Sequence, residues 1–174
     1  MASRLVFDPL VLLRVTPLVS STCTLLHGRD QGFFLGLLNR PESRRAGSGA
    51  LLPAYFSAFF RRGVVVVVAL LAVTAWSSVA NLCSARGPAA IADRLRLRWW
   101  YAAAAAFSTA HLLFVPLVAP PIKAIVDADK DDGDPADANA ALETWLRINR
   151  VRTLTVDLAA WIASLGAVVS SLRA

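Results

Sequence analysis

The chain has 174 residues, of which 56% are hydrophobic and 17% are charged. Soluble domains carry roughly 45–50% apolar and about 25% charged residues, so this composition argues against a soluble enzyme. The length allows one domain. The net charge is +6, but the arginines flank apolar stretches, which indicates anchoring at a membrane interface and not nucleic-acid binding.

Four nearly uncharged stretches follow one another, at about residues 9–26, 63–85, 99–121 and 153–172. Each has roughly the 20 residues that a helix needs to cross a hydrocarbon core of about 30 Å. In lipid the backbone must satisfy its own hydrogen bonds, so each stretch is predicted to be helical. The sequence therefore predicts an all-α fold, a transmembrane four-helix bundle forming a single membrane domain over residues 1–174, with both termini on one side.

A soluble protein with unusually apolar buried helices is the competing interpretation. Soluble helices keep a polar face at a period near 3.6 residues. Between Gly63 and Trp76 the only polar residue is Thr74. The second stretch therefore favours a membrane span.

The connections between the spans differ in character. Residues 27–62 are expected to form a long, partly amphipathic loop, whose apolar pieces FFLGLL and LLPAYFSAFF lie in the interface or pack back on the bundle. Residues 86–98 form a short basic connection. Pro120 and Pro121 are expected to end the third span. Residues 123–143 hold seven acidic side chains and are predicted to be an exposed acidic loop, leading into a helix that starts near residue 137 or 139.

The two cysteines, Cys23 and Cys83, lie near span ends that face opposite sides of the membrane. A disulfide needs Cα atoms within about 7 Å of each other. The two thiols are therefore predicted not to pair within one chain. No spacing of ligands typical of a zinc site is present, and no metal site is predicted.

Polar residues in the fourth helix are candidates for chemistry, because burying them in lipid is costly. At about 100° per residue, Trp145, Asn149 and Arg152 fall on one stripe. Asp157 and Trp161 fall on a neighbouring stripe. An intramembrane carboxylate needs a partner or a proton, so Asp157 is either structural or part of a site.

The third helix places His111 near mid-membrane, on a stripe shared with Trp100 and Ser108. His111 is either an interhelical hydrogen-bonding residue or a base. Serine and threonine in the spans are expected mostly to bond back to their own helix, and Arg147 and Arg150 to be lipid-facing anchors. Alternating helix directions are expected to gather one further group at one face: His27, Arg61, Arg62, Asn149 and Arg152.

The segment TWLRINRVRTLTVDLAAW, with Trp145, Asn149 and Arg152 in W-x3-N-x2-R spacing, resembles the anthrone oxygenase family. HLLFVPLVAPPIKAI, from His111, is similar to the end of that family's third span. The run AYFSAFFRRG and the layout of four spans with a long first loop are also similar. The resemblance is strongest over residues 98–173.

The resemblance implies a membrane monooxygenase of polyketide secondary metabolism that oxidises an anthrone-like aromatic to a quinone. Molecular oxygen would be the co-substrate, with no other cofactor. An anthrone is acidic at its methylene because the resulting anion is aromatic, so the site needs a base and donors for the oxyanion. His111 or Asp157 would be the base, and Asn149 and Arg152 would hold the oxyanion. The expected substrate-binding residues are Trp100, Ser108, Trp145 and Trp161.

Two other functions fit the same spans. A non-catalytic scaffold or assembly protein explains the helices and leaves the polar entrance unused. A small transporter would use the polar groups, but no internal repeat is present. The expected partners are the lipid bilayer and a small aromatic polyketide-like substrate, with no nucleic acid. The sequence predicts a multi-pass membrane protein and leaves open the organelle and a homo-oligomer.

Overall fold

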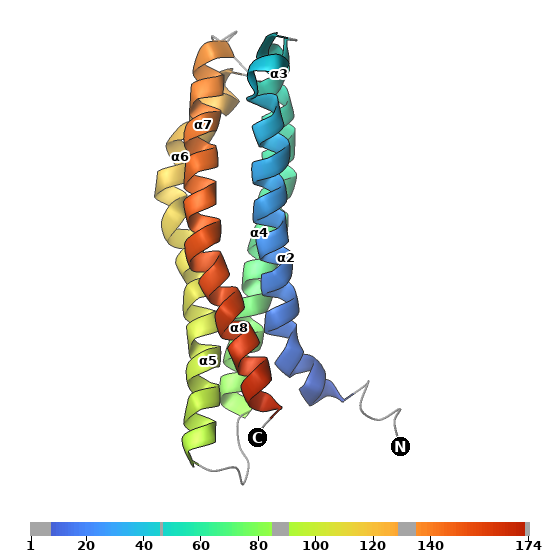
Figure 1. Ribbon diagram of the computed structural model, residues 1–174, viewed down its shortest axis with the longest axis vertical. Coiled ribbons are helices and arrows are strands. Elements are labelled where there is room, and N and C mark those ends of the chain that lie inside the picture. The colour runs from blue at the N-terminus through green and yellow to red at the C-terminus, as the bar shows by residue number, and fades with distance from the viewer. Residues whose placement is uncertain (1–7, 46, 85–90, 129–134, 173–174) are drawn as a thin grey trace. The chain divides into compact units, whose positions relative to one another are not determined.

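A computed structural model describes residues 8–45, 47–84, 91–128 and 135–172. No strand occurs within these ranges, which confirms the all-α fold (Figure 1). The elements in chain order are α2 (Pro9–Leu38), α3 (Pro41–Arg45), α4 (Ser48–Ser84), α5 (Ile91–Ala110), the 3-10 turn η1 (His111–Phe114), α6 (Val115–Ala128), α7 (Pro135–Arg152), the π-turn η2 (Thr153–Asp157) and α8 (Leu158–Ser171).

Four helical segments are long and apolar enough to cross a membrane. They are Pro9–Leu38, Ser48–Ser84, Leu95–Ala128 and Asp137–Ser171. Only 17–28% of the most apolar window of each segment is buried within the protein. Most of the apolar surface therefore faces outward, as expected of helices that contact lipid and not of helices in a soluble core.

The connection between the first two spans is shorter than the sequence predicted. Helix α2 continues to Leu38 and α4 begins at Ser48, so FFLGLL and LLPAYFSAFF are both helical. Leu35, Leu52 and Phe56 are fully buried, which shows that these pieces pack back on neighbouring helices. The predicted loop began too early because the polar run after residue 28 interrupts the apolar pattern without ending the helix.

The acidic connection is also shorter than predicted. Helix α6 continues through Pro120 and Pro121 to Ala128, and α7 begins at Pro135. The remaining residues of this segment, 129–134, lie outside the described residues. The proline pair does not end the span, because neighbouring groups in membrane helices can satisfy the carbonyls that a proline leaves without a donor.

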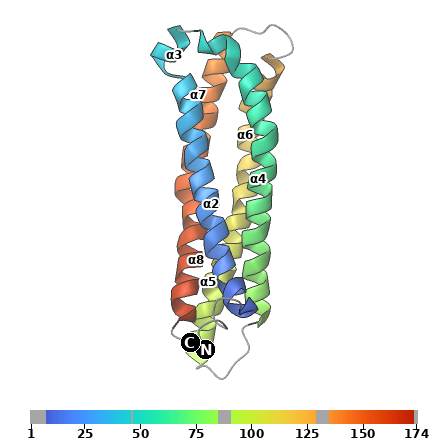
Figure 2. The ribbon, with the colours of Figure 1, turned by 90° about the vertical axis from the view of Figure 1, so that its right-hand side faces the viewer.

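The chain divides into two compact units. Unit 1 comprises Met1–Leu25, Val68–His111 and Leu154–Ala174. Within it, α5 packs along α8, and the start of α2, the end of α4, the start of α5 and the end of α8 lie at one end (Figure 2). The buried face of α8 consists of small residues, which let membrane helices approach closely: Ala160, Ala163, Ser164 and Ala167.

Unit 2 comprises Leu26–Val67 and Leu112–Thr153. Within it, α6 packs on α7 around a larger apolar core. The rings of Phe56 and Trp145 meet edge to face, with centroids 5.7 Å apart and planes at 85°. Such pairs add to the gain from burial. The other buried core residues are Leu35, Leu52, Ile125, Ala138 and Leu142.

Two glycines offer a matched test of helix packing. An added Cβ at Gly166 would lie 2.7 Å from the indole of Trp100, whereas one at Gly36 would meet nothing within 4 Å. We expect Gly166→Ala to lower the free energy of unfolding by about 1–3 kcal/mol, because a rigid ring must move. Gly36→Ala should raise it by roughly 0.5–1 kcal/mol, through its helix propensity. Thermal unfolding in detergent measures both, and equal shifts would contradict the close α5–α8 contact.

Candidate functional site

A buried hydrogen bond between His111 and Asp157 is the main polar feature of unit 1. The His111 Nδ1 lies 2.7 Å from the Asp157 Oδ1, and the residues are 6% and 2% exposed. A carboxylate only accepts, so Nδ1 carries the shared proton, and in a neutral imidazole Nε2 is then the acceptor. The carboxylate therefore fixes the orientation and the tautomer of the imidazole ring. Both residues were candidates from sequence, and the structure brings them together.

The backbone is irregular at both members of this pair. His111 is the first residue of the 3-10 turn η1, and Asp157 is the last residue of the π-turn η2. Short 3-10 stretches and π-turns inside long helices occur often at functional sites. Here two such departures from α-helical geometry coincide with the two ends of one buried hydrogen bond.

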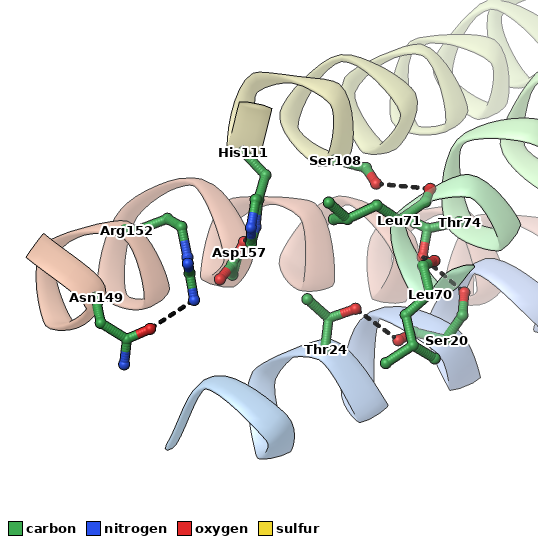
Figure 3. A network of polar contacts seen from close by, with 10 residues as sticks. All are labelled: Ser20, Thr24, Leu70, Leu71, Thr74, Ser108, His111, Asn149, Arg152 and Asp157. Atoms are coloured by element: carbon green, nitrogen blue, oxygen red, sulfur yellow. Dashed lines mark hydrogen bonds and ion pairs between the residues drawn. The ribbon is translucent and has the colours of Figure 1, made fainter. Parts of the chain in front are cut away.

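The hydroxyl groups of unit 1 make two kinds of hydrogen bond (Figure 3). Many bond back to their own helix, as predicted, for example Thr24 to the Ser20 carbonyl at 3.0 Å. Others join different helices. Ser20 Oγ lies 2.7 Å from Thr74 Oγ1, and Ser108 Oγ donates to the Leu71 carbonyl at 3.2 Å. These bonds tie α4 to α2 and α5 without leaving the polar atoms unpaired in an apolar setting.

Unit 2 contains a second polar centre, built on α7. Arg152 Nη2 donates to Asn149 Oδ1 at 2.6 Å (Figure 3). Asn149 Nδ2 in turn donates to the Gly28 carbonyl at 3.0 Å. Asn149 is 2% and Arg152 is 7% exposed. The amide thus bridges the α2 backbone and the guanidinium. The hydrogen bond from Arg152 to Asn149 therefore fixes the position of the buried guanidinium.

His27 and Gln31 extend the second centre along α2. Their side chains are 3.0 Å apart, His27 Nε2 to Gln31 Nε2. An added Cβ at Gly63 would lie 3.4 Å from Gln31 Nε2, so α4 approaches α2 closely here. His27 thus lies on α2 beside Gly28, whose carbonyl binds Asn149 of α7, whereas Arg61 and Arg62 of α4 are exposed and do not join a buried group.

Gln31 and Gly28 were missed by the sequence reasoning. The spacing of four between His27 and Gln31 on one helix was an available signal. The signal for Gly28 was weaker. A glycine in the middle of a helix lowers stability, so its presence there suggests that a neighbouring group occupies the space of a side chain. An added Cβ there would lie 2.7 Å from Thr153 Oγ1, which explains why a larger residue does not fit.

The buried stripe along the last long helix changes register at the π-turn. On α7, in unit 2, the buried positions include 145, 149 and 152, and in unit 1 the buried positions of η2 and α8 include 157, 160, 164 and 167. A regular helix would have placed Val156 next on the stripe. The prediction that Arg152 and Asp157 lie on neighbouring stripes assumed a regular α-helix, whereas the π-turn Thr153–Asp157 follows Arg152 and adds one residue to the turn.

The three predicted tryptophans have different surroundings. Trp145 lies in the unit 2 core against Phe56. Trp161 donates its indole N–H to Thr22 Oγ1 at 2.9 Å, and Trp100 lies against Gly166. The predicted anchors Arg147 and Arg150 are exposed.

Potential metal ligands do not cluster in the part of the chain that the structure describes: no three His, Cys, Asp or Glu side chains meet there. Cys23 and Cys83 are free thiols, which confirms that they do not pair with each other. The side chains of the two polar centres include an imidazole, a carboxylate, amides and a guanidinium.

Comparison with known proteins gives relatives over nearly the whole chain. The epoxidase pydX of Acremonium sp is 30% identical over 168 residues, 94% of this chain and 96% of that protein. The epoxidase gkaX of Penicillium citrinum is 30% identical over 169 residues, 92% of this chain and 95% of that protein. A Mollisia scopiformis protein named probable epoxidase scpX is 26% identical over 164 residues, with 92% and 96% covered. No protein-family model and no solved structure matches the chain.

Proposed function

Because the chain belongs to the family of the epoxidases pydX and gkaX, we propose that it is a membrane oxygenase acting on an apolar, conjugated small molecule. The names of these relatives support an oxidoreductase activity in general. The resemblance of residues 98–173 to anthrone oxygenases supports the same class of reaction, with a polyketide-like aromatic as substrate.

The observation that carries the proposal is the buried pair of His111 and Asp157. An oriented imidazole with Nε2 as acceptor can remove a proton from a substrate C–H or O–H that conjugation has made acidic. Asp157 then stabilises the imidazolium that forms. A scaffold role does not account for this buried ionisable pair, because a buried charged pair contributes little to the stability of a fold.

Oxygen chemistry follows from the anion that this base creates. The anion gives two electrons to O2, a C–O bond forms, and the returning proton completes a hydroperoxide. Loss of water from a CH–OOH group gives a carbonyl, which is the change from anthrone to anthraquinone. Alternatively, the distal oxygen transfers to a neighbouring C=C bond, the O–O bond breaks, and an epoxide forms beside a hydroxyl group. The substrate supplies the electrons in both cases, so neither route requires a further reductant.

The second polar centre has a supporting role in this proposal. Arg152 would stabilise the oxyanion of the substrate as charge develops. Asn149, which holds Arg152 and the Gly28 carbonyl, would be a positioning residue. From the sequence, both Asn149 and Arg152 were expected to donate directly to the oxyanion. In the present proposal only Arg152 does so.

Isotope labelling tests the function. Membranes containing the protein, supplied with ¹⁸O2 and an anthrone, should yield a quinone carrying one ¹⁸O atom, at a rate well above that of control membranes. A substrate with an acidic C–H beside a C=C bond should yield an epoxide and a hydroxyl that both carry ¹⁸O. NAD(P)H should not be required.

Three results would contradict the proposal: no rate above the control membranes, label from water instead of oxygen, or strict dependence on a nicotinamide reductant. Arg150→Gln is the matched control. Arg150 is exposed on the same helix as Arg152, so this variant should retain full activity.

A further inference from the structure

An open groove of about 630 Å³ lies in unit 1. Trp100 and Gly166 both line it, and the indole packs against α8 because Gly166 has no side chain. Trp99, which is 74% exposed, forms a wall. Its remaining lining residues are Arg96, Ala103, Val169 and Ser170.

The groove lies at the ends of two candidate membrane spans. Arg96 is one residue inside the span Leu95–Ala128, and Ser170 is one residue inside the span Asp137–Ser171. If these helices span the bilayer, the groove opens at the boundary between hydrocarbon and head groups. Tryptophan and arginine are both favoured at this level.

The chemistry of the lining is that of an amphiphile site. Arg96 is the only charged residue among the lining residues, and the rest of the surface is mainly aromatic or aliphatic. The volume falls in the range of roughly 300–1,000 Å³ that is usual for small-ligand sites. We propose that this groove binds one phospholipid with an anionic head group, with the phosphate near Arg96 and an acyl chain along Trp100 and Val169.

The enzyme's own substrate is a poorer occupant. Arg96 and His111 are fifteen residues apart, on α5 and at the first residue of η1. At about 1.5 Å per residue, the groove's cation lies roughly 20 Å from the base along this helix. A molecule held at Arg96 therefore has its anionic end far from the proposed base, so the lipid site is independent of the oxygenase proposal.

The test uses the full-length protein in nanodiscs with equal amounts of phosphatidylcholine and phosphatidylinositol, followed by native mass spectrometry after transfer to detergent. The wild-type protein should retain one phosphatidylinositol in preference to phosphatidylcholine. Arg96→Gln should reduce that preference about fivefold, the effect of roughly one basic residue near an anionic surface. Ala103→Phe, which fills the apolar part, should reduce retention of both lipids.

Arg150→Gln removes an exposed arginine from α7, in unit 2, and should leave lipid retention unchanged. An equal loss in this control would show a general effect of surface charge and overturn the proposal. Equal retention of the two lipids by the wild-type protein would also overturn it. Oxygenase turnover of Arg96→Gln, measured with anthrone in detergent, should match that of the wild type, and a loss there would assign the groove to the substrate instead.

Discussion

Replacing Asp157 with asparagine is expected to lower kcat by roughly 10³–10⁴-fold, as when an oriented catalytic histidine loses its carboxylate. The Asp157 Oδ1 accepts a hydrogen bond from the His111 Nδ1, at a distance of 2.7 Å between the two atoms. An amide can instead donate to Nδ1, which places the proton on Nε2 and removes the base. The melting temperature should change little or rise, because the substitution removes a buried charge. Turnover of anthrone and thermal unfolding of the same preparation measure both effects.

A double-mutant cycle separates a catalytic pair from a structural one. If the two residues act as a unit, Asp157→Asn combined with His111→Ala should be no slower than His111→Ala alone. Multiplying losses would show that the residues act separately. A purely structural pair would lower the melting temperature of every variant and leave the kcat of the folded fraction intact.

Arg152→Gln is the second large expected effect, with a fall in kcat of about 10²–10³-fold, the usual cost of a lost donor to a developing oxyanion. The guanidinium is buried and fixed by Asn149 Oδ1 at 2.6 Å. Its removal should leave the substrate KM nearly unchanged, because the interaction strengthens as charge develops. Steady-state kinetics in detergent provide both constants.

Gly28 provides a graded control for the same centre. Gly28→Ala places a Cβ 2.7 Å from Thr153 Oγ1 and should displace the carbonyl that binds Asn149, lowering kcat about tenfold or more. Thr153→Ala removes the obstructing atoms, so the double variant should recover most of the loss. Thr153→Ala alone should be nearly neutral, because Thr153 Oγ1 is buried without a hydrogen-bond partner. If the double variant were as slow as Gly28→Ala, the contact would not set the position of Arg152.

The helices could be predicted because lipid imposes one simple rule on the backbone. Each of the four nearly uncharged stretches falls on a helix long enough to span, apart from the end residues 85 and 172. The ends of those helices could not be predicted in the same way. Helix α2 passes through the polar residues Arg29 and Asp30, and α6 passes through Pro120 and Pro121. Hydrophobicity marks the part of a helix that lies in lipid, whereas its ends depend on packing against other segments of the chain.

The polar candidates could be found because ionisable groups are rare in these spans. His111 and Asp157 stood out for that reason, but their direct contact depends on two irregular turns that leave no pattern in the sequence. The bridging role of Asn149 was equally hidden, since it needs the backbone carbonyl of Gly28. Side chains show their chemistry in the sequence, while backbone acceptors look alike at every position.

The π-turn Thr153–Asp157 also determines how α8 is rotated about its own axis. Each residue of an α-helix advances the side chains by about 100°. Deleting one residue from Thr153–Asp157 would therefore rotate all of α8 by that angle. Each later side chain would then take the position of the residue before it, so Ala163 would occupy the exposed place of Ile162, and the bulkier Leu165 would occupy the fully buried place of Ser164. The extra residue of the π-turn thus determines which side of α8 faces its neighbours in unit 1. We therefore expect insertions and deletions to be tolerated far less in Thr153–Asp157 than at the ends of the helices.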